Sequence, residues 1–188
     1  MSDNIFAGAD GSKITRRINQ AEVLEKITGL DFTSEKDPNT GYPVKWLGST
    51  GKMASSGDLD LGVAESEINK DELASKLMKW CLMNGVPKEG ILNVKASKAN
   101  AGKKDGWVDK TGDSVHFRAP INGNADNGFI QTDFMFTPDP QWQQWAMRGG
   151  KEGSKFKGAH RHQLMAALAK VQNPNWMYSY KSGLVAVS

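Results

Sequence analysis

The 188-residue chain is 38% hydrophobic and has a net charge of +3, so it can form one compact domain with a buried core but is not basic enough overall to indicate nucleic acid. No stretch approaches the roughly 20 apolar residues of a membrane-spanning helix, and the first residues lack the charged-then-apolar order of a signal peptide. The only cysteine, Cys81, cannot close an intramolecular disulfide, and its apolar neighbours predict a helix core. We therefore expect an intracellular, cytoplasmic protein without a membrane partner.

The first half of the chain is predicted to hold two helices and two strands. Residues 1–12 are small and polar and are expected to be flexible. Apolar spacing and turn residues then predict a helix from Ile14 to Gly29, a strand over 43–47, a strand over 58–63 and a helix capped by Asn69 that ends at Gly85. The second strand is identified by its alternation of polar and apolar residues.

The second half is predicted to be mainly β-structure followed by a helix. The predicted elements are a strand over 91–96, an antiparallel hairpin of strands 114–121 and 129–136, a helix over 159–171 and one or two strands in 176–187. In the helix, Leu164, Leu168 and Val171 are expected to face inward. This order predicts an α/β or α+β fold with a mixed sheet flanked by helices.

Basic residues are concentrated in two segments. Between Lys95 and Lys110 there are five lysines against two aspartates, and between Arg148 and Lys170 six Lys or Arg residues accompany only Glu152. Such runs are more often solvated surface than binding sites. They would indicate a nucleic-acid partner only beside a site that handles phosphate.

Three aspartates are candidate metal ligands. Residues i and i+2 of a strand share a face, so Asp58 and Asp60 project side by side while their apolar neighbours turn into the core. Asp133 lies in another apolar strand, where burial of an unpaired charge is costly. Together they could hold two divalent ions about 3.5–4 Å apart. The alternatives are a solvent-facing Asp-x-Asp pair and a salt-bridged core aspartate at 133.

A candidate phosphate-binding turn precedes the first two aspartates. Gly48 and Ser49 follow a predicted strand. A glycine lets the backbone approach a phosphate closely, and the serine hydroxyl and backbone N–H groups can bind its oxygens. Lys52 would add a positive charge nearby.

The order of these residues resembles the nucleotidyltransferase superfamily that includes DNA polymerase beta. The matching motif is Leu47-Gly48-Ser49, eight further residues, Asp58-Leu59-Asp60-Leu61 and a later aspartate, Asp133. The resemblance implies a palm-like catalytic domain, here residues 13–147, that uses two Mg²⁺ ions, or Mn²⁺, to move a nucleoside monophosphate from a nucleoside triphosphate to an acceptor hydroxyl. It implies that Asp58 and Asp60 bind both ions, and that Asp133 binds the catalytic ion and helps to deprotonate the acceptor.

A second segment is similar to the part of family X polymerases that lines the nucleotide pocket. It comprises Gly153-Ser154-Lys155-Phe156, then Arg161 and Ser182-Gly183-Leu184. The similarity implies that residues 148–188 complete the pocket, with Gly153, Ser154 and Phe156 near the sugar and base. The chain would then be a minimal or shortened form of the enzyme, of the kind that phages and mobile elements encode.

The acceptor is left open by the sequence. The basic segments favour a nucleic acid 3′ end. The alternative acceptor is a protein or a small molecule, as in toxin–antitoxin or antibiotic-modifying enzymes. The alternative functions are a non-catalytic nucleotide- or nucleic-acid-binding module and a structural protein with a coincidental Asp-x-Asp. Only one lysine follows Gly48-Ser49 and there is no helix-hairpin-helix pattern, so templated gap filling is not expected.

The remaining aromatic and histidine residues are expected to be structural. His160 and His162, at i and i+2 of a helix, do not share a face and are not expected to bind zinc. His116 is interpreted as a hydrogen-bonded strand residue rather than a base. Trp142 and Trp145, which lie near a predicted helix, are interpreted as core residues.

Overall fold

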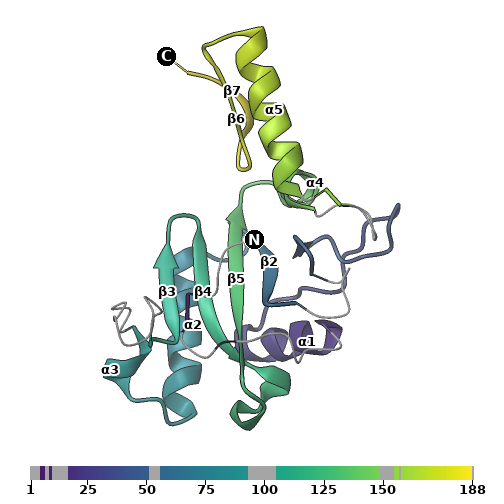
Figure 1. Cartoon of the computed structure of the whole chain (residues 1–188). Helices are drawn as coiled ribbons and strands as arrows, with labels where there is room; N and C mark the ends of the chain where they lie inside the picture. The colour runs from purple at the N-terminus through teal and green to yellow at the C-terminus, as the bar shows by residue number, and fades with distance from the viewer. Residues whose placement is uncertain are drawn as a thin grey trace.

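The main body of the protein is a five-stranded mixed sheet flanked by helices (Figure 1). The computed structural model describes residues 5, 6, 9, 17–50, 56–92, 105–148, 155, 156 and 158–187. Its elements are α1 (Arg17–Thr28), β1 (Trp46–Leu47), β2 (Asp58–Ala64), α2 (Lys70–Met83), α3 (Lys88–Ile91), β3 (Val108–Thr111), β4 (Ser114–Pro120), the 3₁₀ turns η3 (Ile121–Gly123) and η4 (Ala125–Asn127), β5 (Phe129–Thr137), α4 (Pro140–Met147), α5 (Gly158–Gln172), β6 (Trp176–Ser179) and β7 (Gly183–Ala186). This arrangement confirms the predicted α+β class and is consistent with a palm-like fold.

The strands of the sheet are ordered β1-β2-β5-β4-β3. β2 and β5 are parallel, and the other neighbouring pairs are antiparallel. The predicted hairpin is confirmed as β4 and β5, which pair from Pro120↔Phe129 to Ser114↔Met135. The parallel pair in the middle of the sheet brings together the two strands that carry the three aspartates.

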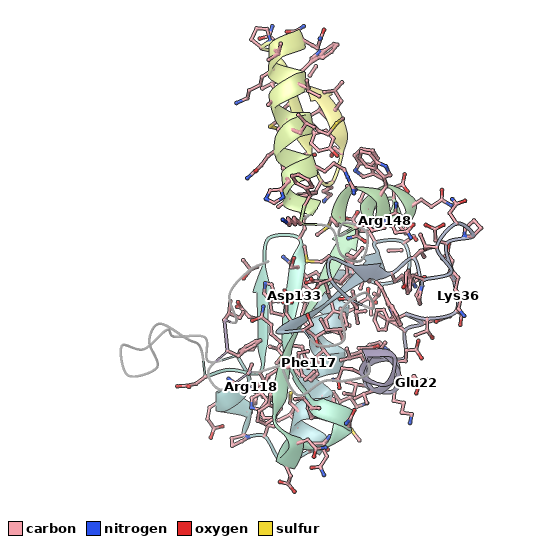
Figure 2. All side chains as sticks on the ribbon, turned by 45° about the vertical axis from the view of Figure 1, so that its right-hand side comes forward. Glu22, Lys36, Phe117, Arg118, Asp133 and Arg148 are labelled. Carbon is pink, nitrogen blue, oxygen red and sulfur yellow. The ribbon has the colours of Figure 1, made fainter. Side chains whose placement is uncertain are left out.

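One face of the sheet packs on α1 and α2 to form the core. Alternate residues of β2, β4 and β5, such as Leu61, Phe117 and Phe134, point to this face and pack with Leu24 of α1 and Leu77 of α2. Period-two alternation therefore leaves the intervening residues of each strand on the opposite face, as Figure 2 shows for Phe117 and its neighbour Arg118. That opposite face carries the candidate site.

Helix α2 forms as its sequence predicts. The Asn69 side chain accepts the N–H of Glu72 at 2.8 Å and so caps the helix, which is followed by Gly85 with φ +82°. Cys81 is fully buried in the helix, and burial raises the pKa of its thiol to about 12. Both findings agree with a core cysteine rather than a nucleophile.

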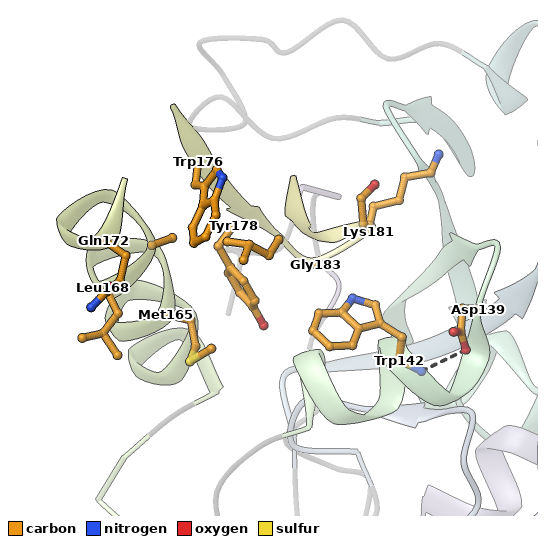
Figure 3. A pocket seen from close by; sticks show the side chains of 12 residues that line it. Asp139, Trp142, Met165, Leu168, Gln172, Trp176, Tyr178, Lys181 and Gly183 are labelled. Carbon is orange, nitrogen blue, oxygen red and sulfur yellow. Dashed lines mark hydrogen bonds between the residues drawn. The ribbon is translucent and has the colours of Figure 1, made fainter. Parts of the chain in front are cut away.

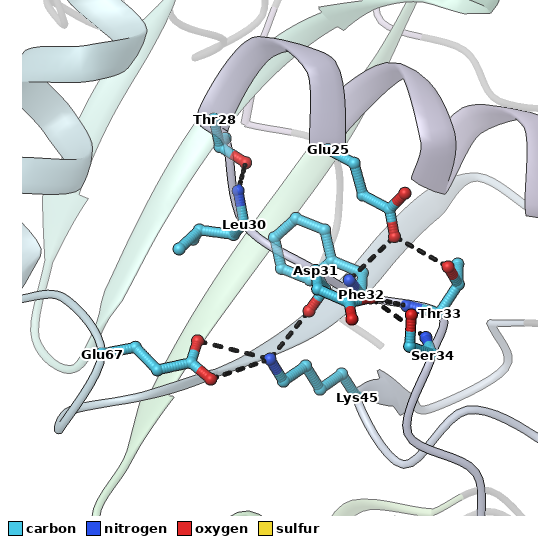
Figure 4. Close-up of polar contacts among 9 residues, drawn as sticks. All are labelled: Glu25, Thr28, Leu30, Asp31, Phe32, Thr33, Ser34, Lys45 and Glu67. Atoms are coloured by element: carbon cyan, nitrogen blue, oxygen red, sulfur yellow. Dashed lines mark hydrogen bonds and ion pairs between the residues drawn. The ribbon is translucent and has the colours of Figure 1, made fainter.

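A buried lysine fastens the segment between α1 and β1 to the sheet. The Lys45 ammonium donates to the carbonyl oxygen of Asp31 at 2.7 Å and to Glu67 Oε1 at 3.2 Å (Figure 4). Glu25 Oε1 accepts the N–H of Phe32 at 2.9 Å and so anchors the other side of the same segment. This segment leads directly into β1, so these contacts fix where the Gly48-Ser49 turn begins.

The last three elements, α5, β6 and β7, form what we call the C-terminal unit, which extends from the sheet beyond α4 (Figure 1). Lys181 fastens it to the main body through Glu65 and Asp113, each at 3.2 Å. The indole N–H of Trp142 in α4 donates to the carbonyl oxygen of Tyr180 at 2.8 Å. The predicted final helix and strands are thus confirmed.

Several predictions of local structure are wrong. Ile91 ends the short helix α3 instead of starting a strand, while residues 93–96 lie outside the described part. Leu164, Leu168 and Val171 are 58%, 48% and 80% exposed, because α5 packs on the β6–β7 hairpin and buries only Ala169. Trp145 of α4 is 41% exposed rather than a core residue.

Parts of the N-terminal segment are buried although residues 1–12 are predicted to be flexible. Phe6 and Ala9 are 1% and 8% exposed, and Ala9 pairs with Phe129 of β5. The other residues of the segment, apart from Ile5, lie outside the described part of the chain. At least at these positions, the segment adds to the core.

Candidate metal centre

Strand pairing brings the three predicted aspartates together. β2 and β5 align in parallel with Asp60 opposite Asp133, and Asp58 lies two residues before Asp60 on the same face. One carboxylate oxygen from each of the three lies within 4.8 Å of the others. Asp58 and Asp133 are only 7% and 3% exposed, and Asp60 is partly buried. Within the described residues, this is the one group of three or more acidic, histidine or cysteine side chains close enough to share a metal ion.

The electrostatics of the cluster favour a cation. Burial, followed by the negative charges of Asp58 and Asp133, raises the pKa of the Asp60 carboxyl well above its ordinary value. Ionisation of Asp60 is therefore less favourable in the cluster than in water. A divalent ion among the three carboxylates would offset this repulsion.

Asp133 is oriented by two neighbouring side chains. Its Oδ1 lies 2.5 Å from His116 Nδ1 and accepts the Nε2–H of Gln131 at 2.9 Å. The N–H of Ile5 donates to Gln131 Oε1 at 2.6 Å and thereby fixes which end of the amide faces Asp133. These two contacts fix the orientation of the Asp133 carboxylate beside the other two aspartates.

The sequence interpretation of His116 missed its contact with Asp133. His116 is a hydrogen-bonded strand residue as expected, but it lies directly opposite Asp133 in the β4–β5 ladder. Against an ionised carboxylate the imidazole must donate its Nδ1–H, which fixes the tautomer. A histidine or carboxylate that holds a metal ligand in this way commonly affects metal affinity. The signal that could have found it is the register of the predicted hairpin.

We predict that replacing His116 with leucine weakens Mn²⁺ binding by about 10- to 100-fold, because Asp133 loses one of the two groups that orient it. The variant His116→Asn, which places an amide N–H near the position of Nδ1, should restore most of the affinity. Titration with Mn²⁺ followed by calorimetry measures both. His160→Leu, a change of an exposed histidine on α5, is the control. Equal Mn²⁺ affinity in His116→Leu and the wild type would contradict the role.

The predicted phosphate turn lies against the cluster. Gly48 has φ +57°, and a Cβ atom there would lie 2.8 Å from Asp60 Oδ2. Its N–H donates to the carbonyl oxygen of Met147 at 2.9 Å. Ser49 Oγ lies 3.2 Å from Ser56 Oγ. Phosphate binding by Gly48 and Ser49 stays a prediction, and the absence of a side chain at Gly48 also makes room for Asp60.

Thr50 is a further residue of the turn that the sequence analysis did not identify. It is 4% exposed, and its hydroxyl accepts the N–H of Asp60 at 3.0 Å. Its own N–H donates to the carbonyl oxygen of Leu47 at 3.0 Å, which closes the turn around Gly48. Thr50 thus couples the conformation of the turn to the position of the carboxylate.

The second predicted nucleotide-binding segment is described only in part. Gly153 and Ser154 of this segment lie outside the described residues, as does Lys52 of the predicted phosphate turn. Phe156 is 73% exposed, and its ring contacts His160 at a centroid distance of 5.9 Å. The ring of His162 stacks on the ring of Tyr180 at a centroid distance of 3.9 Å.

Comparison with known proteins does not indicate a function. No family model, curated protein or solved structure matches the chain. Among the described residues, no helix has both the length and the apolar character required to cross a membrane.

Proposed function

We propose that the protein is a nucleotidyltransferase of the DNA polymerase beta-like superfamily, which moves a nucleoside monophosphate from a nucleoside triphosphate to an acceptor hydroxyl. The observation that carries the proposal is the cluster of Asp58, Asp60 and Asp133, whose carboxylate oxygens lie within 4.8 Å of one another beside the Gly48 turn. The motif order described above adds the resemblance to the superfamily.

The donor set fits magnesium. Mg²⁺ prefers carboxylate oxygens and retains water, and it is commonly bound in enzymes by a few carboxylates together with substrate phosphates. Among the residues that the structure describes, the cluster offers only oxygen ligands and includes no cysteine or histidine ligand that would favour zinc. The raised pKa of Asp60 is in keeping with this fit, since burial and then the charges of Asp58 and Asp133 make its ionised form less favourable, and a bound cation would offset both causes.

Each residue of the site has a role in the proposed reaction. Bound Mg²⁺ ions would neutralise the triphosphate, lower the pKa of the acceptor hydroxyl and stabilise the departing pyrophosphate. Asp58 and Asp60 would hold both ions. Asp133, oriented by His116, would hold the catalytic ion and help to receive the proton of the acceptor hydroxyl. The Ser49 hydroxyl contacts the triphosphate.

The proposed acceptor is the 3′ end of a nucleic acid. The support is the basic composition of residues 148–170, which follow the strand that carries Asp133 and the helix packed against the Gly48 turn. A protein or small-molecule acceptor is the competing possibility. An acceptor panel therefore belongs in the first experiment.

The test is to incubate the protein with labelled nucleoside triphosphates, Mg²⁺ or Mn²⁺, and a panel of DNA, RNA and protein acceptors. The double variant Asp58→Asn, Asp60→Asn is the control. Label on one acceptor that depends on the metal and is lost in the variant supports the proposal and identifies the acceptor class. Nucleotide binding without transfer would indicate a non-catalytic module, and no metal-dependent nucleotide binding would indicate a coincidental cluster.

A further inference from the structure

Charge is distributed unevenly along the chain. From Lys155 to Val187 there are five Lys or Arg residues and no Asp or Glu, whereas the chain as a whole has 24 and 21. The remaining residues therefore hold 19 basic and 21 acidic side chains. The C-terminal unit and the few residues before it thus carry the excess positive charge of a chain that is otherwise slightly acidic, which is typical of a segment that meets a polyanion.

Part of this charge faces solvent. Lys155 and Lys170 are exposed, and within the described part of the chain no carboxylate lies within ion-pairing distance of either. The Arg161 guanidinium lies over the Trp145 ring at 5.4 Å. Lys181 differs, because it is paired with Glu65 and Asp113 of the main body. Lys155 and Lys170 can therefore contact phosphates, and so can those N–H groups of Arg161 that do not donate to the Trp145 carbonyl oxygen.

Aromatic side chains line a cavity beside the same unit. A cavity of about 690 Å³ lies between α4, α5 and the β6–β7 hairpin (Figure 3). Its wall includes the rings of Trp142, Trp176 and Tyr178, with Leu168 and Leu184 beside them. Trp176 is 38% exposed, so part of its surface is accessible to a ligand. The size falls in the range of small-molecule sites, and the lining suits a flat ring such as a nucleobase.

The C-terminal unit begins next to the aspartate cluster. Gly158, the first residue of α5, packs so closely on Arg148 that a Cβ atom there would lie 2.8 Å from the Arg148 carbonyl oxygen. Arg148 in turn forms a bridge with Gly48, which lies against Asp60. A polymer with its end at the cluster could therefore continue along α5 towards the cavity.

We propose that the C-terminal unit binds a single-stranded stretch of the nucleic acid acceptor, with one base stacked on Trp176 in the cavity and the phosphates beside Lys155, Arg161 and Lys170. The inference rests on the nucleic acid acceptor of the proposed function. Base stacking on aromatic rings combined with basic side chains is the usual means of binding single strands without sequence preference. A second copy of the chain is a poorer occupant, since it would bring the same excess of positive charge to the surface.

The test measures the binding of fluorescently labelled oligonucleotides of about 12 deoxythymidines or uridines by anisotropy. Trp176→Ala should weaken binding by about 10-fold, and Trp176→Phe, which keeps a ring, should restore most of it. Tyr42→Ala, at an exposed tyrosine of the main body, is the matched control and should bind like the wild type. Equal affinity of Trp176→Ala and the wild type would overturn the inference.

A salt titration tests the electrostatic part. For single strands the slope of log K against log salt is about −0.7 per phosphate contact, so Lys155→Gln, Lys170→Gln should make it shallower by about 1.4. Lys79→Gln, Lys88→Gln, at exposed lysines of α2 and α3, should leave it unchanged. An equal change in both double variants would contradict the proposed surface. Sedimentation equilibrium gives a further test. Self-association of the wild type that is abolished by Leu168→Glu would also contradict the proposed surface.

The catalytic variant separates this inference from the proposed function. Asp58→Asn, Asp60→Asn should bind the oligonucleotide at least as tightly as the wild type, since it changes only the metal cluster. If the wild type binds oligonucleotide through Trp176 but transfers no nucleotide, the inference stands and the transferase proposal fails. If the wild type transfers nucleotide to a nucleic acid but Trp176→Ala binds the oligonucleotide as tightly as the wild type, the transferase proposal stands and the inference about the C-terminal unit fails.

Discussion

Replacing Asp60 with asparagine is expected to abolish metal-dependent transfer and, in the absence of metal, to stabilise the protein. Transfer should fall by on the order of 10³-fold, because a shared metal ligand is lost. The free energy of unfolding should rise because the raised pKa of Asp60 means that ionising this carboxyl in the folded state is unfavourable. Each 1 kcal/mol gained should raise Tm by about 3 °C in a chain of this size.

The sign of this effect predicts a pH dependence. The folded pKa of Asp60 is raised above the ordinary value of 3.8, so the folded state holds the proton more tightly than the unfolded state. The free energy of unfolding of the metal-free wild type should therefore decrease as pH rises from about 4 through the raised pKa. In Asp60→Asn this contribution is absent, so the Tm difference should grow from pH 5 to pH 8 in EDTA.

Magnesium provides the complementary measurement. Binding to the folded state should raise Tm of the wild type with increasing Mg²⁺, and Asp60→Asn should lose most of this rise. Asp126→Asn, at an exposed aspartate of the η4 turn, is the control and should respond to metal as the wild type does. A variant that is no more stable than the wild type in EDTA, with an unchanged response to Mg²⁺, would contradict a metal centre at Asp60.

The parts of the site that could be predicted depend on short-range periodicity. Alternation within β2 places Asp58 and Asp60 on one face whatever the rest of the chain does, and a charged residue in the apolar β5 marks Asp133 as exceptional. The hairpin of β4 and β5 is likewise local, since its strands are joined by a short loop rich in Asn and Gly. Their relative order in the sheet, with β2 beside β5, is a long-range property that the motif order only suggested.

The parts that could not be predicted depend on which surfaces meet. Helical spacing identified an apolar stripe on α5 but could not tell that the β6–β7 hairpin would cover a different side and leave Leu164 and Val171 exposed. The contact between His116 and Asp133 needed the exact register of a hairpin whose loop contains two 3₁₀ turns. Helix α4 was missed although Asp139 at its N-cap and Pro140 in its first turn are typical helix starts.

The absence of a side chain at Gly48 is expected to be required for transfer and for metal binding. In Gly48→Ala the new Cβ atom would lie 2.8 Å from Asp60 Oδ2, so either the turn or the carboxylate must move. A displacement of about 1 Å at a reacting centre can reduce the rate by about 100-fold. We therefore expect transfer to fall by about that factor, together with weaker Mn²⁺ binding measured by calorimetry.

Gly41→Ala separates this clash from ordinary backbone strain. Gly41 has φ +70°, close to the +57° of Gly48, but a Cβ atom there would meet nothing within 4 Å. Both variants should lose about 1–2 kcal/mol of stability, because alanine is disfavoured in the left-handed region. Only Gly48→Ala should lose metal binding and transfer. If the two variants lose stability equally and both keep their Mn²⁺ affinity, then Asp60 tolerates a Cβ atom at position 48 and the turn is not required to leave space for the carboxylate. If only Gly48→Ala loses Mn²⁺ affinity, the turn and the Asp60 carboxylate act as one unit.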